Sequence, residues 1–380
     1  MEMNEIRNRI DEIDSQMVDL YKQRMDAVSE IGEYKRANKL PIYDSERERN
    51  LLNNVGEQAG AEYESGVRAM FQTVMESSRA YQQHKLKSES ALAQKMNDAL
   101  ANTDQLFPPK AMVACQGVEG AYSQIACEKL FSAPSIMYCR NFESVFAAIE
   151  SGLCRYGILP LENTVAGSVN SVYDQMISHN FYIVRSTRIK VAHSLLAKPG
   201  AKLEDIKEVY SHEQAINQCS KFLAEHKNIH VNVCSNTAAA AKLVAESDRA
   251  DVAAISSANC AALYGLSSIA SDIQNDGNNH TRFICISKKL EIYPGANRTS
   301  MMMVLPNKPG SLYHVLGRFY ARGIDLAKLE SRPIPGHDFE FMFYFDINAS
   351  IYSPELKELI AELDTELDQF KYLGSYSEVV

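Results

Sequence analysis

The first residues that could carry chemistry form a line of cations near the start of the chain. Arg24 and Lys35 are eleven residues apart in a stretch whose apolar side chains recur at steps of three and four, as on one face of a long helix. Eleven residues at ~100° each return to nearly the same face, roughly 16 Å further along the axis. Because burying an unpaired cation is costly, an anion should lie between them. The apolar positions of this face are Ile6, Ile10, Ile13, Met17, Leu20, Ala27 and Ile31.

That anion could belong to the protein or to a ligand. An internal ion pair with Asp44, Glu46 or Glu48 is the simpler interpretation of the two cations taken alone. More polar side chains on the next two predicted helices, about 44–57 and from 61 past 80, favour a pocket for a small dicarboxylate. They are Asp44, Arg47, Glu48, Ser78 and Gln82, the last two at i, i+4 spacing.

Arg7 adds a geometric constraint. It precedes Arg24 by 17 residues, which is roughly 25 Å along one helix and ~100° around it. One small ligand can contact both only if a second chain supplies one of them. A long helix pair also has little core of its own, so an intertwined homodimer is expected.

From residue 110 the periodicity changes. Short apolar runs alternate with helix-like stretches, which predicts an α/β unit with mostly parallel sheets and room for two lobes with a cleft. The runs are MVAC, YGILPL, FYIV, EVYS, VNVC, DVAAIS and FICIS.

Four polar clusters stand at predicted strand ends or turns of this unit: residues 117–123, 160–168, 210–212 and 281–283. Helix starts at the carboxyl ends of strands gather anions in α/β folds. Each cluster alone also has a structural explanation; Glu-Asn-Thr is often a capped turn, and His212 is more simply a hydrogen-bonded structural residue. No GxGxxG followed by an acidic residue is present, which disfavours a dinucleotide-dependent dehydrogenase.

A third pattern begins near residue 298. MMMVLP, LAKLESRP, FEFMFYFDI and FKYLGSY are predicted strands, and GSLYHVLGRFYARG and SPELKELIAELDTEL predicted helices, the second with a serine N-cap. Their βαββαβ order is ferredoxin-like, with the turn IPGHD between the middle strands. The predicted fold is therefore multidomain: an all-α domain, a two-lobed α/β domain and an α+β domain. The expected limits are 1–88, a linker 89–108, 109–289 and 297–376.

The composition restricts the class of protein. Hydrophobic residues make up 46%, charged residues 23%, and the net charge is −9, which fits a globular chain and argues against a nucleic-acid or membrane-surface partner. The charged N-terminus lacks a signal region, so a cytoplasmic location is expected. The eight cysteines form no CxxC pair or zinc spacing; buried free thiols are favoured over disulfides, and no metal is expected.

The first segment resembles the all-helical chorismate mutases. IRNRIDEID, YKQRMDAVSEIGEYKR and LPIYDSERERNLL carry the likeness, which covers residues 3–85. The resemblance implies a pericyclic rearrangement that needs no cofactor, in which the site holds a flexible dianion in its reactive shape and places cations at the breaking C–O bond. It also implies roles for individual residues: Arg7 of the partner chain, Arg24 and Arg47 on the carboxylates, Lys35 and Gln82 on the ether oxygen, and Asp44, Glu48 and Ser78 positioning the substrate.

The middle segment resembles prephenate dehydratase over residues 110–288, through PLENTVAGSVNSVYD, VYSHEQAINQCSKFL, CSNTAAA and NNHTRF. The likeness implies two lobes like those of a solute-binding protein, with the active site in the cleft and Thr281 as the leading catalytic residue. We expect its hydroxyl to donate a hydrogen bond to the leaving hydroxyl. The other expected substrate contacts are Ser123, Glu162, Asn163, Thr164, Gly167, Ser168, Ser211, Arg282 and Phe283. The first cluster departs from the family pattern, reading ACQGVEGAYS in place of FLGPxGSYS.

The C-terminal segment resembles an ACT domain, a regulatory module that commonly binds amino acids. Its motifs are KPGSL and ESRP, and Tyr313 stands where related domains carry a smaller residue. A dimerisation module that senses nothing is the alternative. The effector-binding residues that the resemblance implies are Pro309, Gly310, Ser311, Leu312, Glu330, Ser331 and Arg332.

Together the three segments resemble the bifunctional chorismate mutase–prephenate dehydratases. The expected function is conversion of chorismate through prephenate to phenylpyruvate by a homodimer or higher oligomer, with feedback inhibition by phenylalanine. Two alternatives are a non-catalytic aromatic amino-acid sensor, and a mutase fused to a binding lobe.

Overall fold

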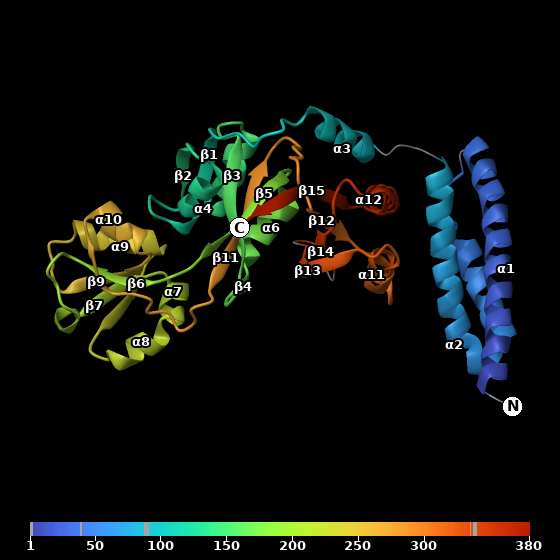
Figure 1. The fold of residues 1–380 in the computed structure, drawn as a ribbon, viewed down its shortest axis with the longest axis horizontal. Helices are drawn as coiled ribbons and strands as arrows, with labels where there is room; N and C mark the ends of the chain where they lie inside the picture. The colour runs from blue at the N-terminus through green and yellow to red at the C-terminus, as the bar shows by residue number, and fades with distance from the viewer. Residues whose placement is uncertain (1–2, 39, 87–90, 335, 337–339) are drawn as a thin grey trace. The chain divides into compact units, whose positions relative to one another are not determined.

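The chain begins with two long helices joined by a short connection (Figure 1). The structure is a computed structural model and describes residues 3–38, 40–86, 91–334, 336 and 340–380. The second helix breaks at Gly60, whose φ of 71° and ψ of 163° are not helical, so the two helices predicted over 44–57 and from 61 are separate. The helices of this part are α1 (Met3–Ala37), α2 (Ser45–Leu86) and α3 (Ala91–Asn102), the last inside the expected linker.

The apolar face predicted for α1 is only partly buried within one chain. Met25 and Val28 are buried, but Ile10 and Met17 are 50% and 47% exposed and Leu20 is 63% exposed. The periodicity therefore predicted the helix correctly, and within a single chain most of its apolar face lies outside any core. An exposed apolar face such as that of α1 usually packs against another surface, which the described residues of a single chain do not supply.

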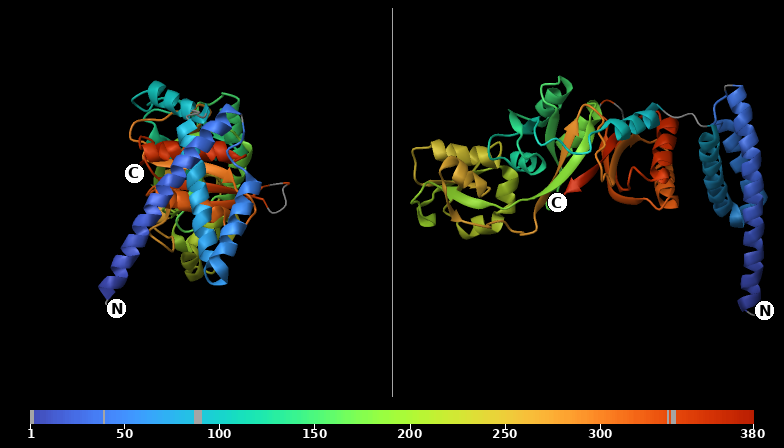
Figure 2. Two further views of the ribbon diagram at one scale, coloured as in Figure 1. Left: turned by 90° about the vertical axis from the view of Figure 1, so that its right-hand side faces the viewer. Right: turned by 45° about the horizontal axis from the view of Figure 1, so that its top comes forward.

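The middle of the chain forms two α/β lobes (Figures 1 and 2). The elements of the first lobe are β1 (Met112–Gln116), α4 (Tyr122–Leu130), β2 (Ser135–Cys139), α5 (Phe142–Glu150), β3 (Tyr156–Asn163), β4 (Gly167–Ser168), α6 (Asn170–Ser178), β5 (Tyr182–Lys190) and β11 (His280–Ser287). The elements of the second are β6 (Ser194–Ala197), η1 (Leu203–Asp205), β7 (Glu208–Ser211), α7 (Glu213–Gln218), α8 (Ser220–Glu225), β8 (His230–Val233), α9 (Thr237–Glu246), β9 (Val252–Ser256), α10 (Asn259–Tyr264) and β10 (Ser267–Ala270).

Both sheets are mixed, which corrects the expectation of mostly parallel sheets. β1 pairs in parallel with β2 and β3, and β7 with β8 and β9. However, β11 returns from the second lobe and enters the first sheet antiparallel to both β3 and β5. The chain therefore crosses between the lobes twice, after β5 and before β11, and the returning strand runs against its neighbours. The predicted two-lobed α/β class is confirmed.

The last part has the predicted ferredoxin-like order. Its elements are β12 (Arg298–Val304), α11 (Ser311–Ala321), β13 (Asp325–Pro333), β14 (Phe341–Asn348), α12 (Pro354–Glu366) and β15 (Phe370–Val379). The strands are antiparallel in the order β13-β14-β12-β15. Ser353 accepts from the backbone N–H of Leu356, as expected of an N-cap. Most of the predicted turn IPGHD lies outside the described residues.

One junction was not predicted: the end of β15 pairs in parallel with β5 through Ser377, Glu378 and Val379. The ferredoxin-like sheet and the first-lobe sheet are thereby one continuous sheet of ten strands. Gly374 makes the junction possible, since its φ is +130° and a Cβ there would lie 2.3 Å from the carbonyl oxygen of Ile183. Only glycine permits this approach of two backbones.

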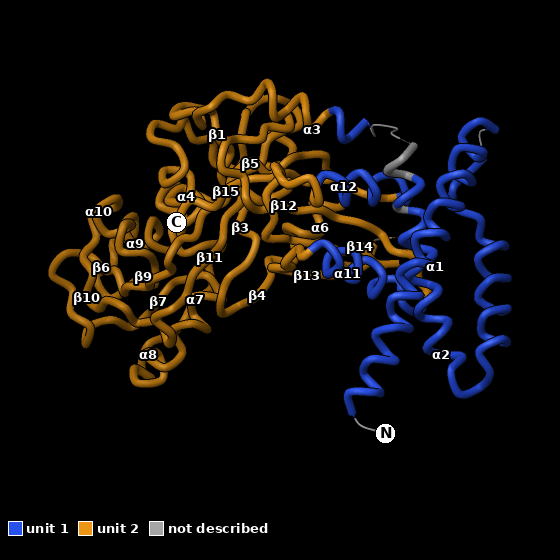
Figure 3. Tube along the Cα trace, turned by 45° about the vertical axis from the view of Figure 1, so that its right-hand side comes forward, with its two compact units in different colours: residues 1–94, 309–322, 357–368 blue, residues 95–308, 323–356, 369–380 orange. Residues whose placement is uncertain are grey.

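The chain divides into two compact units, drawn in two colours in Figure 3. The first contains residues 1–94, 309–322 and 357–368, and the second contains residues 95–308, 323–356 and 369–380. Within the second unit one hydrophobic core includes both lobe residues such as Tyr173 and Ile284 and ferredoxin-sheet residues such as Met302 and Tyr344. The limits expected for three domains stay a prediction.

The structure tests the expectation of buried free thiols and whether any helix could span a membrane. All eight cysteines are free thiols, and seven of them are buried. The part of the chain that the structure describes has no helix long and apolar enough to cross a membrane.

Candidate functional site

The first candidate site lies between α1 and α2. Arg24 donates through Nη1 to the hydroxyl of Ser78, which is only 4% exposed. Gln82, 7% exposed, lies one turn further along α2, and Gly32 on α1 lets it pack closely: a Cβ at Gly32 would be 3.2 Å from the Gln82 Cγ. Burial lowers the pKa of the Arg24 guanidinium, which Tyr21 and Glu48 partly oppose. A desolvated cation whose side-chain contact here is a neutral hydroxyl is suited to an anionic ligand.

The other charged residues around this site are held by local contacts. Lys35 donates to the Ile42 carbonyl over 2.6 Å, and Asp44 accepts from the Arg47 backbone N–H over 3.0 Å at the start of α2. Glu48, one of the carboxylates considered as a partner for the two cations, instead pairs with Arg79. Arg79 was not predicted from the sequence. Its position one residue after Ser78 gave no signal, because nothing in the spacing showed which carboxylate it would meet.

Arg7 and Arg47 are exposed on the single chain, unlike Ser78 and Gln82. Oε1 of Gln82 is buried and meets no hydrogen-bond partner among the described residues. The single chain therefore presents part of a pocket that contains the Arg24 cation, and the buried acceptor Oε1 of Gln82 is left for a hydrogen-bond donor of a ligand or of a second chain.

The second candidate site is a cavity of ≈ 450 Å³ between the two lobes. Its walls come from strand ends of the first lobe and from helix starts of both lobes, including α4 and α9. Helix N-termini carry partial positive charge and free N–H groups, which suits carboxylate ligands. Six predicted contacts line it: Ser123, Asn163, Gly167, Ser168, Thr281 and Phe283.

The orientation of the Asn163 amide determines what Thr281 can do. Oδ1 of Asn163 accepts from the backbone N–H groups of Val165 and Ala166, at 3.0 and 2.9 Å. Its Nδ2 must therefore donate, and it does so to Oγ1 of Thr281 at 2.9 Å and to Oδ1 of Asn279 at 2.6 Å. Because Thr281 accepts here, its own hydroxyl hydrogen remains to be donated into the cavity.

A group of cavity residues was missed from the sequence. His193 is 2% exposed, and its Nε2 lies 2.9 Å from Oε1 of Gln218, which also accepts from Asn279 at 3.0 Å. Gln218 therefore holds a hydrogen on Nε2 of His193. Burial lowers the pKa of His193, although the hydrogen bond with Gln218 opposes this, and so favours the neutral ring. The only sequence signal was a histidine at the start of an apolar strand, which describes many structural histidines equally well.

Four predicted contacts lie outside the lining of this cavity. Ser211 is fully buried and donates to the carbonyl of Ile255. Thr164 donates to the carbonyl of Asn278. Glu162 and Arg282 form an ion pair with each other at 3.3 Å. Because strand residues alternate between faces, they lie on the face opposite Asn163 and Thr281. His212 lines it and caps α7 by accepting from the Gln214 N–H, consistent with a structural role.

The predicted effector residues divide between two environments. Gly310 has a φ of 88° and immediately precedes α11, as the KPGSL motif predicted. Glu330 and Arg332 instead contact the first lobe: Glu330 accepts from the Ser168 hydroxyl at 2.5 Å, and Arg332 pairs with Asp174 at 2.9 Å. Ser331 lies between them and is exposed. Within one chain the two charged residues of ESRP are therefore already engaged.

The helical anion site, the two-lobed cleft and the ferredoxin-like sheet define a multidomain enzyme that acts on small carboxylates. Comparisons with known proteins make this specific. The chorismate mutase type II family model matches residues 6–83, and the prephenate dehydratase family model matches residues 113–291.

Two relatives cover 98% and 70% of this chain. A bifunctional chorismate mutase/prephenate dehydratase of Enterobacter agglomerans is 31% identical over 98% of this chain and 95% of its own length. Arogenate dehydratase/prephenate dehydratase 2 of Arabidopsis thaliana is 37% identical over 70% of this chain and 73% of its own. Among solved structures, prephenate dehydratase from Arthrobacter aurescens in complex with L-Phe is 30% identical, with a TM-score of 0.65 over 70% of this chain and 89% of that one.

The chain belongs to the bifunctional chorismate mutase/prephenate dehydratases. It rearranges chorismate to prephenate and converts prephenate to phenylpyruvate, so the predicted activities are confirmed.

Proposed function

We propose that the cleft performs the dehydratase step through Thr281, whose hydroxyl donates to the leaving hydroxyl of prephenate. The observation that supports this is the Asn163 amide, which fixes Thr281 as an acceptor on one side and so directs its hydrogen into the cavity. The C–CO2 electron pair enters the ring as the ring C–O bond breaks and CO2 is released. The leaving hydroxide, hydrogen-bonded by Thr281, takes up one proton from solvent and departs as water. The start of α4, where Ser123 is buried, and the start of α9 are the proposed anchors for carboxylates.

For the mutase we infer that Arg24, Lys35, Arg47 and Gln82 hold and polarise chorismate. Arg24 is already desolvated beside Ser78, and Gln82 is buried at the same helix pair. Asp44, Glu48 and Ser78 position the substrate or these cations. Catalysis then consists of orientation and charge placement.

The mutase site is proposed to be shared between two chains of a homodimer. The exposed apolar face of α1 supports this, because a second copy would cover it. The same copy would bring its exposed Arg7 to the pocket, which the length of α1 prevents within one chain.

The C-terminal part is proposed to be an ACT domain through which phenylalanine inhibits the enzyme. Its ferredoxin-like topology, the left-handed Gly310 at the start of α11, and the L-Phe complex of the Arthrobacter relative support this. Pro309, Ser311, Leu312 and Ser331 are the remaining proposed contacts. A dimerisation module without an effector is the competing role, and calorimetric titration with phenylalanine, tyrosine and tryptophan decides between them.

The test of the dehydratase proposal is Thr281→Val, which keeps the shape of the side chain and removes the hydroxyl. We expect phenylpyruvate formation to fall by about 10²–10³, the usual effect of losing one well-placed donor, while chorismate consumption is unchanged. Thr281→Ser should retain most of the rate. Wild-type phenylpyruvate formation by Thr281→Val would refute the role of this hydroxyl.

A further inference from the structure

The segment of β11 that contains Thr281 directs side chains to both faces of the sheet, and the two faces make different contacts. The pair Arg282 and Thr281 lies opposite Glu162 and Asn163 on β3. Thr281 and Asn163 point into the cleft and are joined at 2.9 Å, whereas Arg282 and Glu162 point to the other face, where Nη1 and Oε1 are 3.3 Å apart. Because neighbouring residues share one backbone, a rotation that moves Arg282 also moves Thr281.

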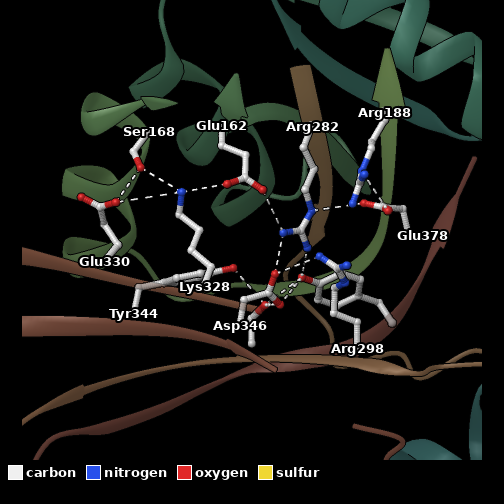
Figure 4. A network of polar contacts seen from close by, with 12 residues as sticks. Glu162, Ser168, Arg188, Arg282, Arg298, Lys328, Glu330, Tyr344, Asp346 and Glu378 are labelled. Carbon is white, nitrogen blue, oxygen red and sulfur yellow. Dashed lines mark hydrogen bonds and ion pairs between the residues drawn. The ribbon is translucent and has the colours of Figure 1, made fainter. Parts of the chain in front are cut away.

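The ferredoxin-like sheet holds Arg282 (Figure 4). The guanidinium is 3% exposed and forms an ion pair with Asp346 of β14, which is fully buried. Nη2 donates to the hydroxyl of Tyr376 at 2.8 Å, and Nε lies 3.4 Å from the Glu378 carboxylate, both on β15. A desolvated guanidinium whose two terminal nitrogens, Nη1 and Nη2, both donate hydrogen bonds has one preferred orientation.

Asp346 is itself fixed inside the ferredoxin-like sheet. Ser300 of β12 donates to it at 3.0 Å, and Arg298 pairs with it at 3.1 Å. Ser300 also meets the hydroxyl groups of Tyr344 and Tyr376, at 2.9 and 2.7 Å. The position of the Asp346 carboxylate therefore depends on β12, β14 and β15 together. Its low-dielectric surroundings strengthen its electrostatic interactions with these groups.

A second contact reaches the cleft from β13. Nζ of Lys328 lies 2.8 Å from Glu162 and 2.9 Å from the hydroxyl of Ser168, which lines the cavity. The register of β11 against β3 shifts between Arg282 and Phe283. A bulge at this position leaves the regular ladder interrupted beside Thr281, so side-chain contacts have more influence on its orientation.

We propose that Asp346 is a positioning residue of the dehydratase, which sets the orientation of Thr281 through Arg282 and transmits the state of the ferredoxin-like sheet to the cleft. The charged side chains of Figure 4 are the physical path, with Lys328 and Glu162 as a parallel branch. The inference rests on the proposed role of Thr281 and on phenylalanine as effector.

The test is Asp346→Asn in the full-length enzyme, which keeps the side-chain volume and removes the charge. We expect the dehydratase kcat to fall by about tenfold, a barrier increase of about 1.4 kcal/mol, with KM within about threefold of the wild type and mutase activity unchanged. Phenylalanine should bind as before by calorimetry, but change the dehydratase rate less than it does in the wild type. A kcat within twofold of the wild type, or an unchanged response to phenylalanine, overturns the proposal.

Two further variants keep this test decisive. Lys328→Met removes the less buried contact with Glu162, and it replaces Asp346→Asn as the test if that variant does not fold. We expect its dehydratase kcat to fall by about threefold. A wild-type kcat overturns the proposal. Arg155→Gln is the matched control, since it removes a partner of the buried Glu291 in the same lobe without contacting the network, and should leave kcat unchanged. Normal activity in Thr281→Val, or a wild type that ignores phenylalanine, would instead contradict the proposed function.

Discussion

Asn163 and Thr281 face each other across β3 and β11, and the amide nitrogen of Asn163 donates to the Thr281 hydroxyl oxygen over 2.9 Å. This contact separates the two hydrogen-bonding capacities of the threonine. One lone pair of its hydroxyl oxygen accepts from the protein, and its hydrogen is available to a ligand. A threonine hydroxyl is a weak acid, so its contribution depends on this preorganisation.

Asn163→Asp should therefore impair the dehydratase although it changes one atom of the side chain. A carboxylate accepts and cannot donate, so the Thr281 hydroxyl would turn its hydrogen toward residue 163 and away from the cavity. We expect kcat for phenylpyruvate formation to fall by about 10², with the mutase rate as the internal control for folding. An unimpaired rate would mean that Thr281 does not act through its hydrogen.

Hybrid dimers test the shared mutase site. Arg7→Ala and Gln82→Ala should each abolish most mutase activity in pure form. When the two chains are co-expressed, half the dimers are hybrids and each hybrid has one intact site, so about a quarter of wild-type activity should return. Chorismate absorbance measures it. A mixture no more active than the separate variants would mean that Arg7 acts within its own chain or not at all.

Acid pH should weaken the Glu162 ion pairs in a defined window. Burial alone would raise the pKa of Glu162, but Lys328 and Arg282 outweigh it and lower the pKa below its usual value. The ionised form therefore stabilises the folded state above the unfolded pKa of about 4.3, and this contribution is lost as the pH falls through the folded pKa. The melting temperatures of the wild type and of Glu162→Gln should differ by a constant amount above the unfolded pKa of about 4.3. They should converge as the pH falls below it. Curves that stay parallel down to pH 3.5 would contradict this.

Gly374→Ala should destabilise the junction between β15 and β5. The added Cβ would collide with the Ile183 carbonyl, so the cost should exceed the roughly 1–2 kcal/mol of an unfavourable φ alone. Gly295→Ala is the matched control, because Gly295 also has a positive φ, of 83°, but its Cβ would meet nothing within 4 Å. Urea unfolding followed by tyrosine fluorescence compares the two, and equal destabilisation would mean that the close approach is not costly.

Much of this protein was determined by local sequence. Periodicity predicted the long helices with the break near Gly60, and the ferredoxin-like order, because helix and strand periods depend on neighbouring residues. Motifs at strand and helix ends identified Thr281, Asn163 and Ser123, which line one cavity. Thr281 at the start of β11 meets Asn163 at the end of β3 because the two strands are antiparallel, which the sequence did not predict.

Only the tertiary structure decided which face each functional side chain serves. Arg282 and Glu162 belong to the same motifs as Thr281 and Asn163 but point toward Asp346 and Lys328, because a strand alternates its side chains and a motif does not say which face meets the cleft. The pairing of β15 with β5 joins residues 192 positions apart, as in the hydrogen bond from Thr187 to Val379. Contacts at such separation depend on how whole elements pack, which no local pattern records.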